Sequence, residues 1–426
     1  MMCLLRSVGI VDFTQRMVSQ HGPTFQLDSV VVFSKPEHVK AILKQIDNIE
    51  ITEPSLPSLA NLSWPLFGCT SLLAQYNPQW HEHRAIINKS FEKSKIFFAP
   101  LQKKAKKCIQ MLNSNTPVHI EGYLHKMTLD ALGICVFGED FDTLSGEFSG
   151  PLQAYNHILR NLFQPILLLF PFLLSTPLYS ELRRNIQTFD SYCWKIINQS
   201  KQAVLEGAPN SNENLIYLML SNGLSDSLVR DNIGVFFLAG HETTTSTLYW
   251  EISMLATYPH VTKKLRNELA QKTSNFTNSL TYEDLKGLTY MDWFIKETMR
   301  LYPAASHIGG RRTTKDMIIG DWFLPKYTNI GLNMVSMLHD KEIWGDPEVF
   351  DPERWNPERL SKRQRSVHLP FSYGPRICIG MNFSLVEQKV FLSTLLTQFS
   401  QIQFGTGEEC VDPKGLTRIP DQNKLI

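Results

Sequence analysis

Apolar residues recur every three or four positions over most of the chain between residues 76 and 300, which is the spacing of an amphipathic helix. This pattern predicts helices over 80–91, 123–137, 189–205, 228–258, 260–271 and 290–301, and a last one over 381–399. Residues 22–44 carry two short β-branched runs ahead of a helix that begins near Pro36, and strand-like pieces return between 305 and 345. The chain is therefore expected to be mainly α with a small β region.

The predicted helix over 228–258 changes character in its middle. It is apolar through Val235-Phe-Phe-Leu-Ala-Gly240 and then polar through His241-Glu-Thr-Thr-Thr-Ser-Thr247. Buried Glu and Thr side chains cost free energy unless they have partners, and Thr is a mediocre helix former. We expect a cavity with water or a ligand against this turn to supply the partners.

No internal repeat and no Gly/Ser-rich or Pro-rich linker divides the chain. We expect one domain over residues 1–426, with a β-rich region built from about 22–60 and 305–345 and a helical region from the remainder. No segment is apolar over the roughly 20 residues that a spanning helix needs. For the lipophilic segment 165–177, a buried loop and a peripheral membrane contact both stay open.

Composition excludes several classes of protein. The 42 Lys and Arg residues nearly balance the 41 Asp and Glu residues, so bulk charge does not favour binding to nucleic acid. With 43% hydrophobic and 19% charged residues, the chain is neither disordered nor a coiled-coil array. Its seven cysteines include no C-x-x-C pair, which argues against a disulfide scaffold and a cysteine zinc site.

The strongest chemical feature is the loop Phe371-Ser-Tyr-Gly-Pro-Arg-Ile-Cys-Ile-Gly380. Cys378 stands just before a predicted helix, where backbone amides can hydrogen-bond a thiolate and hold its charge. Gly374 and Gly380 permit tight turns and the close approach of a planar group. A lone cysteine is usually an inert core residue, but this context favours a functional one.

Glu297 and Arg300 lie three positions apart on a predicted helix, so they share a face and can pair. Arg354, in Phe350-Asp-Pro-Glu-Arg-Trp355, offers a third member of a buried bidentate network. The alternative is a surface salt bridge worth under about 1 kcal/mol.

Two weaker motifs complete the set. Ala239-Gly-His-Glu-Thr-Thr244 lies on the long helix, where Thr243 can also bond back to the Ala239 carbonyl. Trp80 and Arg84 are four positions apart and share one helix face, whereas the intervening histidines make a poor metal pair.

In this order and at this spacing, the four motifs resemble the cytochrome P450 family, in its eukaryotic microsomal type. They are similar to its haem-propionate helix, its oxygen-activation motif, its ExxR helix and its haem-ligand loop, at residues 80–84, 239–244, 297–300 and 371–380. The resemblance covers nearly the whole chain from about Gly22. It implies the triangular, mainly α prism of that family.

The resemblance implies haem (Fe protoporphyrin IX) as cofactor, with Cys378 as the proximal thiolate ligand of the iron and Phe371 beside the sulfur. It implies that Glu242 and Thr243 form a proton-delivery pair, and that the ExxR network fixes the loop that presents Cys378. The implied ligands of the propionates are Trp80, Arg84, Arg376 and either Arg311 or Arg312, because the register there is ambiguous by one residue.

The implied activity is that of a haem-thiolate monooxygenase, which inserts one atom of O2 into a lipophilic small molecule. Since no flavin or NADPH motif follows the haem loop, electrons are expected from NADPH–cytochrome P450 reductase, with cytochrome b5 as a further candidate. Basic residues offer either a docking face for an acidic reductase or ordinary solvated surface. They are Lys89, Lys93, Lys95, Lys103, Lys104, Lys106, Lys107, Arg359, Lys362, Arg363 and Arg365.

The substrate pocket implied by the resemblance is mostly apolar, and the protein is expected to be a monomer. His307 is the polar exception and either points into the pocket or satisfies a backbone carbonyl. The expected lining residues are Phe236, Phe237, Ala239, Gly240, residues 304–308 and the segment around Ile419.

Two rival interpretations stay open. Relatives that rearrange or dehydrate hydroperoxides need no reductase, although the pair Glu242 and Thr243 counts against them. The other rival is a non-catalytic haem-binding or misfolded product of a truncated gene. The anchor helix and Pro-rich hinge of microsomal members do not stand at the start of this sequence. If the sequence is truncated, we expect the cytoplasmic face of the endoplasmic reticulum membrane, and otherwise the cytoplasm.

Overall fold

A computed structural model of the chain describes residues 10–51, 68, 70–91, 94–112, 118–146, 148, 150–162, 166–167, 170–206, 214–276, 280–305 and 307–403. The chain falls into two compact units, the first of residues 1–50, 94–128 and 242–426 and the second of 51–93 and 129–241. Helices α7 (Ile120–Leu132) and α12 (Asp226–Thr257) contribute residues to both.

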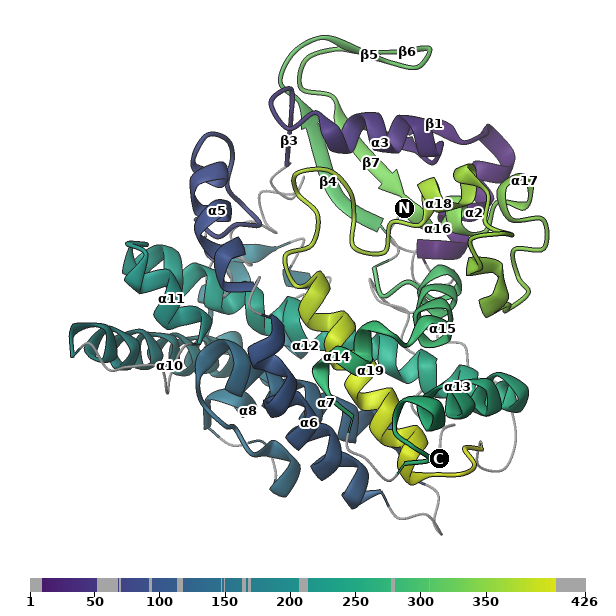
Figure 1. The fold of residues 1–426 in the computed structure, drawn as a ribbon. Helices are drawn as coiled ribbons and strands as arrows, with labels where there is room; N and C mark the ends of the chain where they lie inside the picture. The colour runs from purple at the N-terminus through teal and green to yellow at the C-terminus, as the bar shows by residue number, and fades with distance from the viewer. Residues whose placement is uncertain are drawn as a thin grey trace. The chain divides into compact units, whose positions relative to one another are not determined.

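The first unit contains both sheets (Figure 1). The larger has the strand order β1-β2-β7-β4-β3, and β5 pairs with β6 in a separate hairpin. Strand β2 runs parallel to β7, so the beginning of the chain is joined to a distant segment. The bounds are β1 (Thr24–Leu27), β2 (Val30–Phe33), β3 (Ile49–Ile51), β4 (His307–Thr313), β5 (Met317–Ile319), β6 (Trp322–Leu324) and β7 (Asn329–Asn333).

The sheet is covered by helix α3 (Pro36–Lys44), which begins with the expected proline. Phe33 of β2 and Leu332 of β7 are buried in one cluster with Val39 of α3, because alternate residues of a strand share a face. The connection of β1 to β2 is only two residues long, and Asp28 adopts a φ of 53° that such a hairpin turn requires.

Among the helices of the first unit, α6 and α19 lie side by side (Figure 1), and α13 and α14 also contact α19. Phe97 of α6 meets Phe383 of α19 edge to face, with ring centroids 5.3 Å apart. The bounds are α2 (Ile10–His21), α6 (Ser94–Met111), α13 (Pro259–Lys272), α14 (Tyr282–Lys286), α15 (Thr289–Leu301), α16 (Met334–Leu338), α17 (Lys341–Trp344), η5 (Pro352–Trp355), α18 (Lys362–Val367) and α19 (Met381–Gln398).

The second unit is built around aromatic rings. Phe237 of α12 stacks on Phe137 with centroids 4.5 Å apart, and Tyr155 and Phe189 pack on it at 5.2 and 5.1 Å. Its elements are α5 (Gln79–Phe91), η1 (Gly133–Phe137), η2 (Thr143–Ser145), α8 (Gly150–Leu162), η3 (Pro171–Ser175), η4 (Pro177–Tyr179), α10 (Ser180–Leu205) and α11 (Leu215–Ser221).

The mainly α class with a small β region is confirmed, and the predicted helices are present with shifted ends. Helix α7 changes at Gly133 into a π-helical turn, so the predicted helix over 123–137 is two elements. Helix α6 was not predicted, because Pro100 and a run of lysines obscure its period. Among the described residues, no helix is both long and apolar enough to cross a bilayer.

Candidate functional site

The loop that precedes α19 is held by its own backbone. The amide of Cys378 donates to the Phe371 carbonyl at 2.8 Å, and the amide of Ile377 donates to the Gly374 carbonyl at 3.1 Å. Gly374 has a φ of 76°, and a Cβ there would lie 2.5 Å from the Leu43 carbonyl oxygen of α3. This position therefore requires glycine, as the sequence indicated.

The backbone at Gly380 does not need the conformational freedom of glycine. Its φ of −80° is open to any residue, and it forms the N-cap of α19. A Cβ there would lie 3.9 Å from the sulfur of Cys378, which is an ordinary contact. The loop thus places Cys378 two residues before the N-cap of an 18-residue helix, close to the end of the helix at which the dipole favours negative charge.

Cys378 is exposed, whereas Cys108, Cys135 and Cys193 are buried. Burial raises the pKa of Cys193 to about 12, so that thiol stays protonated at neutral pH. An accessible sulfur at a helix N-terminus, beside a glycine, fits the donor that a haem iron requires. On this observation, the residues of the loop fit the cofactor that the sequence implied.

The predicted network around Glu297 is present and buried. Arg300 donates from Nε and from a terminal nitrogen to the two carboxylate oxygens at 3.0 and 2.9 Å, and both side chains are fully buried. Arg354 donates from Nε to the same carboxylate at 3.3 Å, and to the carbonyls of Trp344 and Asp346. The surface-bridge alternative is therefore wrong.

Two further donors to Glu297 were missed. The Trp355 indole donates to Oε2 at 2.9 Å, and the Asp351 amide donates to Oε1 at 3.1 Å. With four donor groups the buried carboxylate is fully satisfied, which is the condition for keeping such a charge away from water. The signal was available, because Trp355 follows Arg354 in the same short motif.

His368, three residues before the cysteine loop, contacts this network and was also missed. Its Nε2 lies 3.1 Å from the Lys296 carbonyl of α15, and its ring packs on Trp355 with centroids 4.4 Å apart. Burial and the charges of Lys296 and Arg300 lower the pKa of His368 to about 3. The ring is therefore neutral and donates from Nε2 to the carbonyl.

Two threonines in the polar part of α12 have hydroxyl partners on other helices of the first unit. Thr244 Oγ1 lies 3.1 Å from Ser384 Oγ of α19, and Thr245 Oγ1 lies 2.8 Å from Thr128 Oγ1 of α7. Thr244 and Thr245 are buried, while Glu242 is only half-buried.

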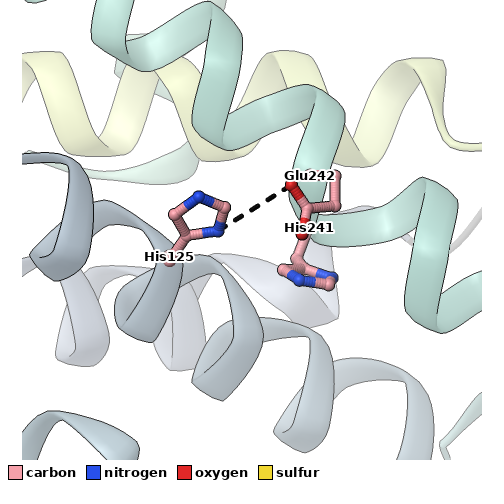
Figure 2. Close-up of side chains that lie close together, drawn as sticks. All are labelled: His125, His241 and Glu242. Atoms are coloured by element: carbon pink, nitrogen blue, oxygen red, sulfur yellow. Dashed lines mark ion pairs between the residues drawn. The ribbon is translucent and has the colours of Figure 1, made fainter. Parts of the chain in front are cut away.

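Thr243 is half-buried as well. The pair Glu242 and Thr243 is thus the accessible part of this turn, with buried residues on both sides of it. Figure 2 shows His125 of α7 facing Glu242, with 4.0 Å between Nδ1 and Oε2. His241, the preceding residue on the same helix, is buried, and its Nδ1 lies 2.5 Å from the Phe237 carbonyl.

The arginines assigned to the propionates lie on three elements. On α5, Trp80 is buried and the guanidinium carbon of Arg84 is 5.9 Å from its ring centroid, so the predicted shared face is confirmed. On β4, Arg312 donates to Glu50 at 2.7 Å, while Arg311 is buried. Burial lowers the pKa of Arg311 to about 10. Arg376 is half-buried in the loop.

Two expectations about surroundings are wrong. Phe237 is a core residue of the second unit, since its side chain is fully buried among aromatic rings, whereas Ala239 is exposed. Lys104 is also buried and does not belong to a basic surface, although Lys103 and Lys106 are exposed. Ile419, Lys93 and the side chain of His307 lie outside the described residues.

Comparison with known proteins identifies the family. The Cytochrome P450 family model matches residues 7–426. Cytochrome P450 3A11 of Mus musculus is 29% identical over 420 residues, which cover 92% of this chain and 81% of the relative. Cytochrome P450 72A68 of Medicago truncatula is 27% identical over 419 residues, which cover 92% and 78%. The chain therefore belongs to the cytochrome P450 family.

Cytochrome P450 3A2 of Rattus norvegicus is 29% identical over a shorter stretch of 345 residues, which cover 76% of this chain and 68% of the relative. Membership of the family makes the chain an oxidoreductase, a haem-thiolate monooxygenase that uses O2 and a small-molecule substrate. Haem with a thiolate ligand, when bound, supplies the activation of O2.

Proposed function

We propose that this monooxygenase inserts one oxygen atom into a lipophilic substrate, with electrons from a separate NADPH-dependent reductase. The observation that carries the proposal is the exposed sulfur of Cys378, held at the start of α19 by the bond from its amide to Phe371. We further propose that the two compact units form one domain, because the family match runs across both.

Four cationic or polar side chains hold the two propionates in this proposal. Arg311, Arg376 and Arg84 supply guanidiniums, which bind carboxylates bidentately, and Trp80 supplies one indole N–H. Arg311 is preferred over Arg312 because Arg311 is buried, whereas the side chain of Arg312 is 38% exposed and pairs with Glu50. A buried guanidinium such as that of Arg311 gains most from a carboxylate partner, since water does not reach it well.

Glu242 and Thr243 move protons in this proposal, with Thr243 as the hydroxyl donor and Glu242 as the acid that reprotonates it. Their support is accessibility, since the residues on either side of them are buried. Phe371 shields the sulfur of Cys378, and Gly374 and Gly380 let the loop and helix approach the cofactor. His368 and the Glu297 network hold the base of the loop.

The lipophilic segment before α10 supports a peripheral membrane contact, and hence a place at the endoplasmic reticulum. Phe172 and Leu178 are 66% and 77% exposed, and Ile166 and Phe170 are also accessible. Exposed apolar side chains in one short segment are typical of interfacial anchors. Leu167, in contrast, is buried.

The decisive experiment is the absorption spectrum of the reduced, carbon-monoxide-bound protein. Thiolate ligation gives a strongly red-shifted Soret band, and Cys378→Ser should abolish it because a serine hydroxyl does not ionise at neutral pH. Cys193→Ala changes a buried thiol in the other unit and should leave the band in place. An unchanged spectrum in Cys378→Ser would overturn the assignment.

Turnover then separates the monooxygenase from a hydroperoxide-rearranging enzyme. Purified protein, reductase and NADPH should consume O2 and form product from a lipophilic probe substrate. Product from hydroperoxide alone, with none from NADPH and reductase, would contradict the proposal.

A further inference from the structure

One histidine ring lies between two carboxylates in the first unit. Nδ1 of His125 is 4.0 Å from Oε2 of Glu242 on α12, and Nε2 of the same ring is 3.6 Å from Oε1 of Glu121. Glu121 and His125 are one helical turn apart on α7. Figure 2 shows the ring of His125 directed at the Glu242 carboxylate.

The three side chains are neither sealed nor fully solvated. Glu121, His125 and Glu242 are 12%, 26% and 24% exposed. They form a continuous line of titratable groups from the first turn of α7 to the acid of the proton-delivery pair. Such a line can carry protons between solvent and Glu242.

The other groups around this place do not compete for the same role. His241 precedes Glu242 on α12, but its Nδ1 is engaged by the Phe237 carbonyl. Thr128, one turn after His125 on α7, bonds to Thr245 and to the Leu124 carbonyl. Glu387 of α19 is fully buried, and burial raises its pKa well above the usual range.

We propose that His125 is a positioning residue that relays protons to Glu242, an inference that rests on the proton-delivery role proposed for Glu242. The ring accepts a proton at Nε2, on the Glu121 side, and releases one from Nδ1 to Oε2 of Glu242. One proton enters and one leaves, so the ring ends as the other tautomer, and the starting tautomer returns when Nε2 gives its proton to water and Nδ1 takes one from water. Histidine suits this task because its ring binds protons at two nitrogens near neutral pH.

Both separations are longer than a hydrogen bond, so each transfer needs a small side-chain rotation or one bridging water. This is ordinary for groups that act in turn, since catalytic contacts tighten only when the complex forms. A ring that merely fixed the orientation of Glu242 would need one close bond and only one of its nitrogens. Here each nitrogen faces a different carboxylate.

The first test observes the ring directly and needs no turnover. In the ferrous carbon-monoxide complex with 13C-labelled histidine, NMR resolves the rings of the 12 histidines, and the His125 signal is the one lost in His125→Gln. Because a carboxylate favours the protonated ring, Glu242→Gln and Glu121→Gln should each move its titration midpoint to lower pH. Glu181→Gln, whose carboxylate lies 3.8 Å from His157, should leave it unchanged.

The second test follows protons during turnover. His125→Gln keeps a hydrogen-bonding side chain but cannot titrate, so hydrogen peroxide released per NADPH should rise about threefold or more, as for loss of a proton donor. The hydrogen peroxide released per NADPH should increase with pH in the wild type and should be independent of pH in His125→Gln. His157→Gln removes another His–Glu pair and should match the wild type.

The outcomes distinguish this inference from the function on which it rests. If His125→Gln keeps the wild-type pH profile and peroxide release, or if Glu242→Gln leaves the His125 midpoint in place, the relay is wrong. The red-shifted band and product formation would still support the monooxygenase. Loss of the band in wild-type protein would instead overturn the proposed function.

Discussion

The role of a single arginine in this protein depends on how many acceptors its guanidinium binds. Arg354 and Arg359 lie five positions apart, but Arg354 reaches Glu297 and the carbonyls of Trp344 and Asp346, whereas Arg359 makes one surface pair with Asp351. Their side chains are 12% and 55% exposed. A guanidinium that binds several acceptors at once cannot be replaced by an ammonium without loss.

The same substitution should therefore have different effects at the two positions. Arg354→Lys should lower the free energy of unfolding by about 1–3 kcal/mol, because bonds to charged and carbonyl acceptors are lost in a buried place. Arg359→Lys should change it by less than about 0.5 kcal/mol. Urea denaturation of both variants measures the difference, and equal effects would contradict the assigned network.

At the scale of elements, the long helices carry polar groups on buried faces. Thr244 and Thr245 of α12 find hydroxyl partners on α19 and α7, whereas Glu387 of α19 is 1% exposed and has no hydrogen-bond partner among the described residues. Burial raises the pKa of Glu387 well above its ordinary value. Burial thus favours the protonated form of this carboxyl in the folded protein.

The raised pKa of Glu387 determines how the free energy of unfolding changes with pH. The pKa of Glu387 is higher in the folded than in the unfolded protein. Its contribution to the free energy of unfolding is therefore complete at pH values below about 4.3 and is lost as the pH rises through the folded pKa. Glu387→Gln removes that loss, so the variant should resist urea better than the wild type at pH 7.5, with the difference vanishing near pH 4. The exposed Glu283 is the control, and Glu283→Gln should not reproduce this pH dependence. A constant difference between Glu387→Gln and the wild type at both pH values would contradict a buried neutral carboxyl.

On the scale of the whole molecule, charge is nearly balanced but not uniform. Lys362, Arg363 and Arg365 are exposed on α18, which precedes the Cys378 loop in the same unit. Such a group of cations can steer an acidic partner to the protein. Lys104, which the sequence placed with the basic residues, is buried and takes no part.

Charge reversal at these positions should therefore slow electron delivery. Arg363→Glu with Arg365→Glu should reduce the rate of the first reduction by the reductase proposed as partner, and the deficit should shrink as salt rises, because screening weakens steering. Stopped-flow reduction under carbon monoxide measures this rate. Lys263→Glu on α13 reverses one exposed charge elsewhere, and an equal effect there would argue against a specific docking face.

How far the sequence predicts this protein depends on whether the information is local. The spacing of Glu297 and Arg300, the shared face of Trp80 and Arg84, and the need for glycine at position 374 all follow from helix and turn geometry over a few residues. The class of protein followed from four such motifs in order, and the comparisons confirm it. Residues that are near in sequence constrain one another through short-range sterics, and these constraints can be recognised from the sequence alone.

The tertiary structure decided what depends on neighbours far along the chain. Only folding shows that Arg312 pairs with Glu50, that Phe237 and Lys104 are buried, and that His125 faces Glu242. Burial and long-range pairing depend on which surfaces meet, and residue identity alone does not specify them. The sequence therefore determined which chemically active residues the protein carries. Packing in the tertiary structure decided which neighbours contact and orient them.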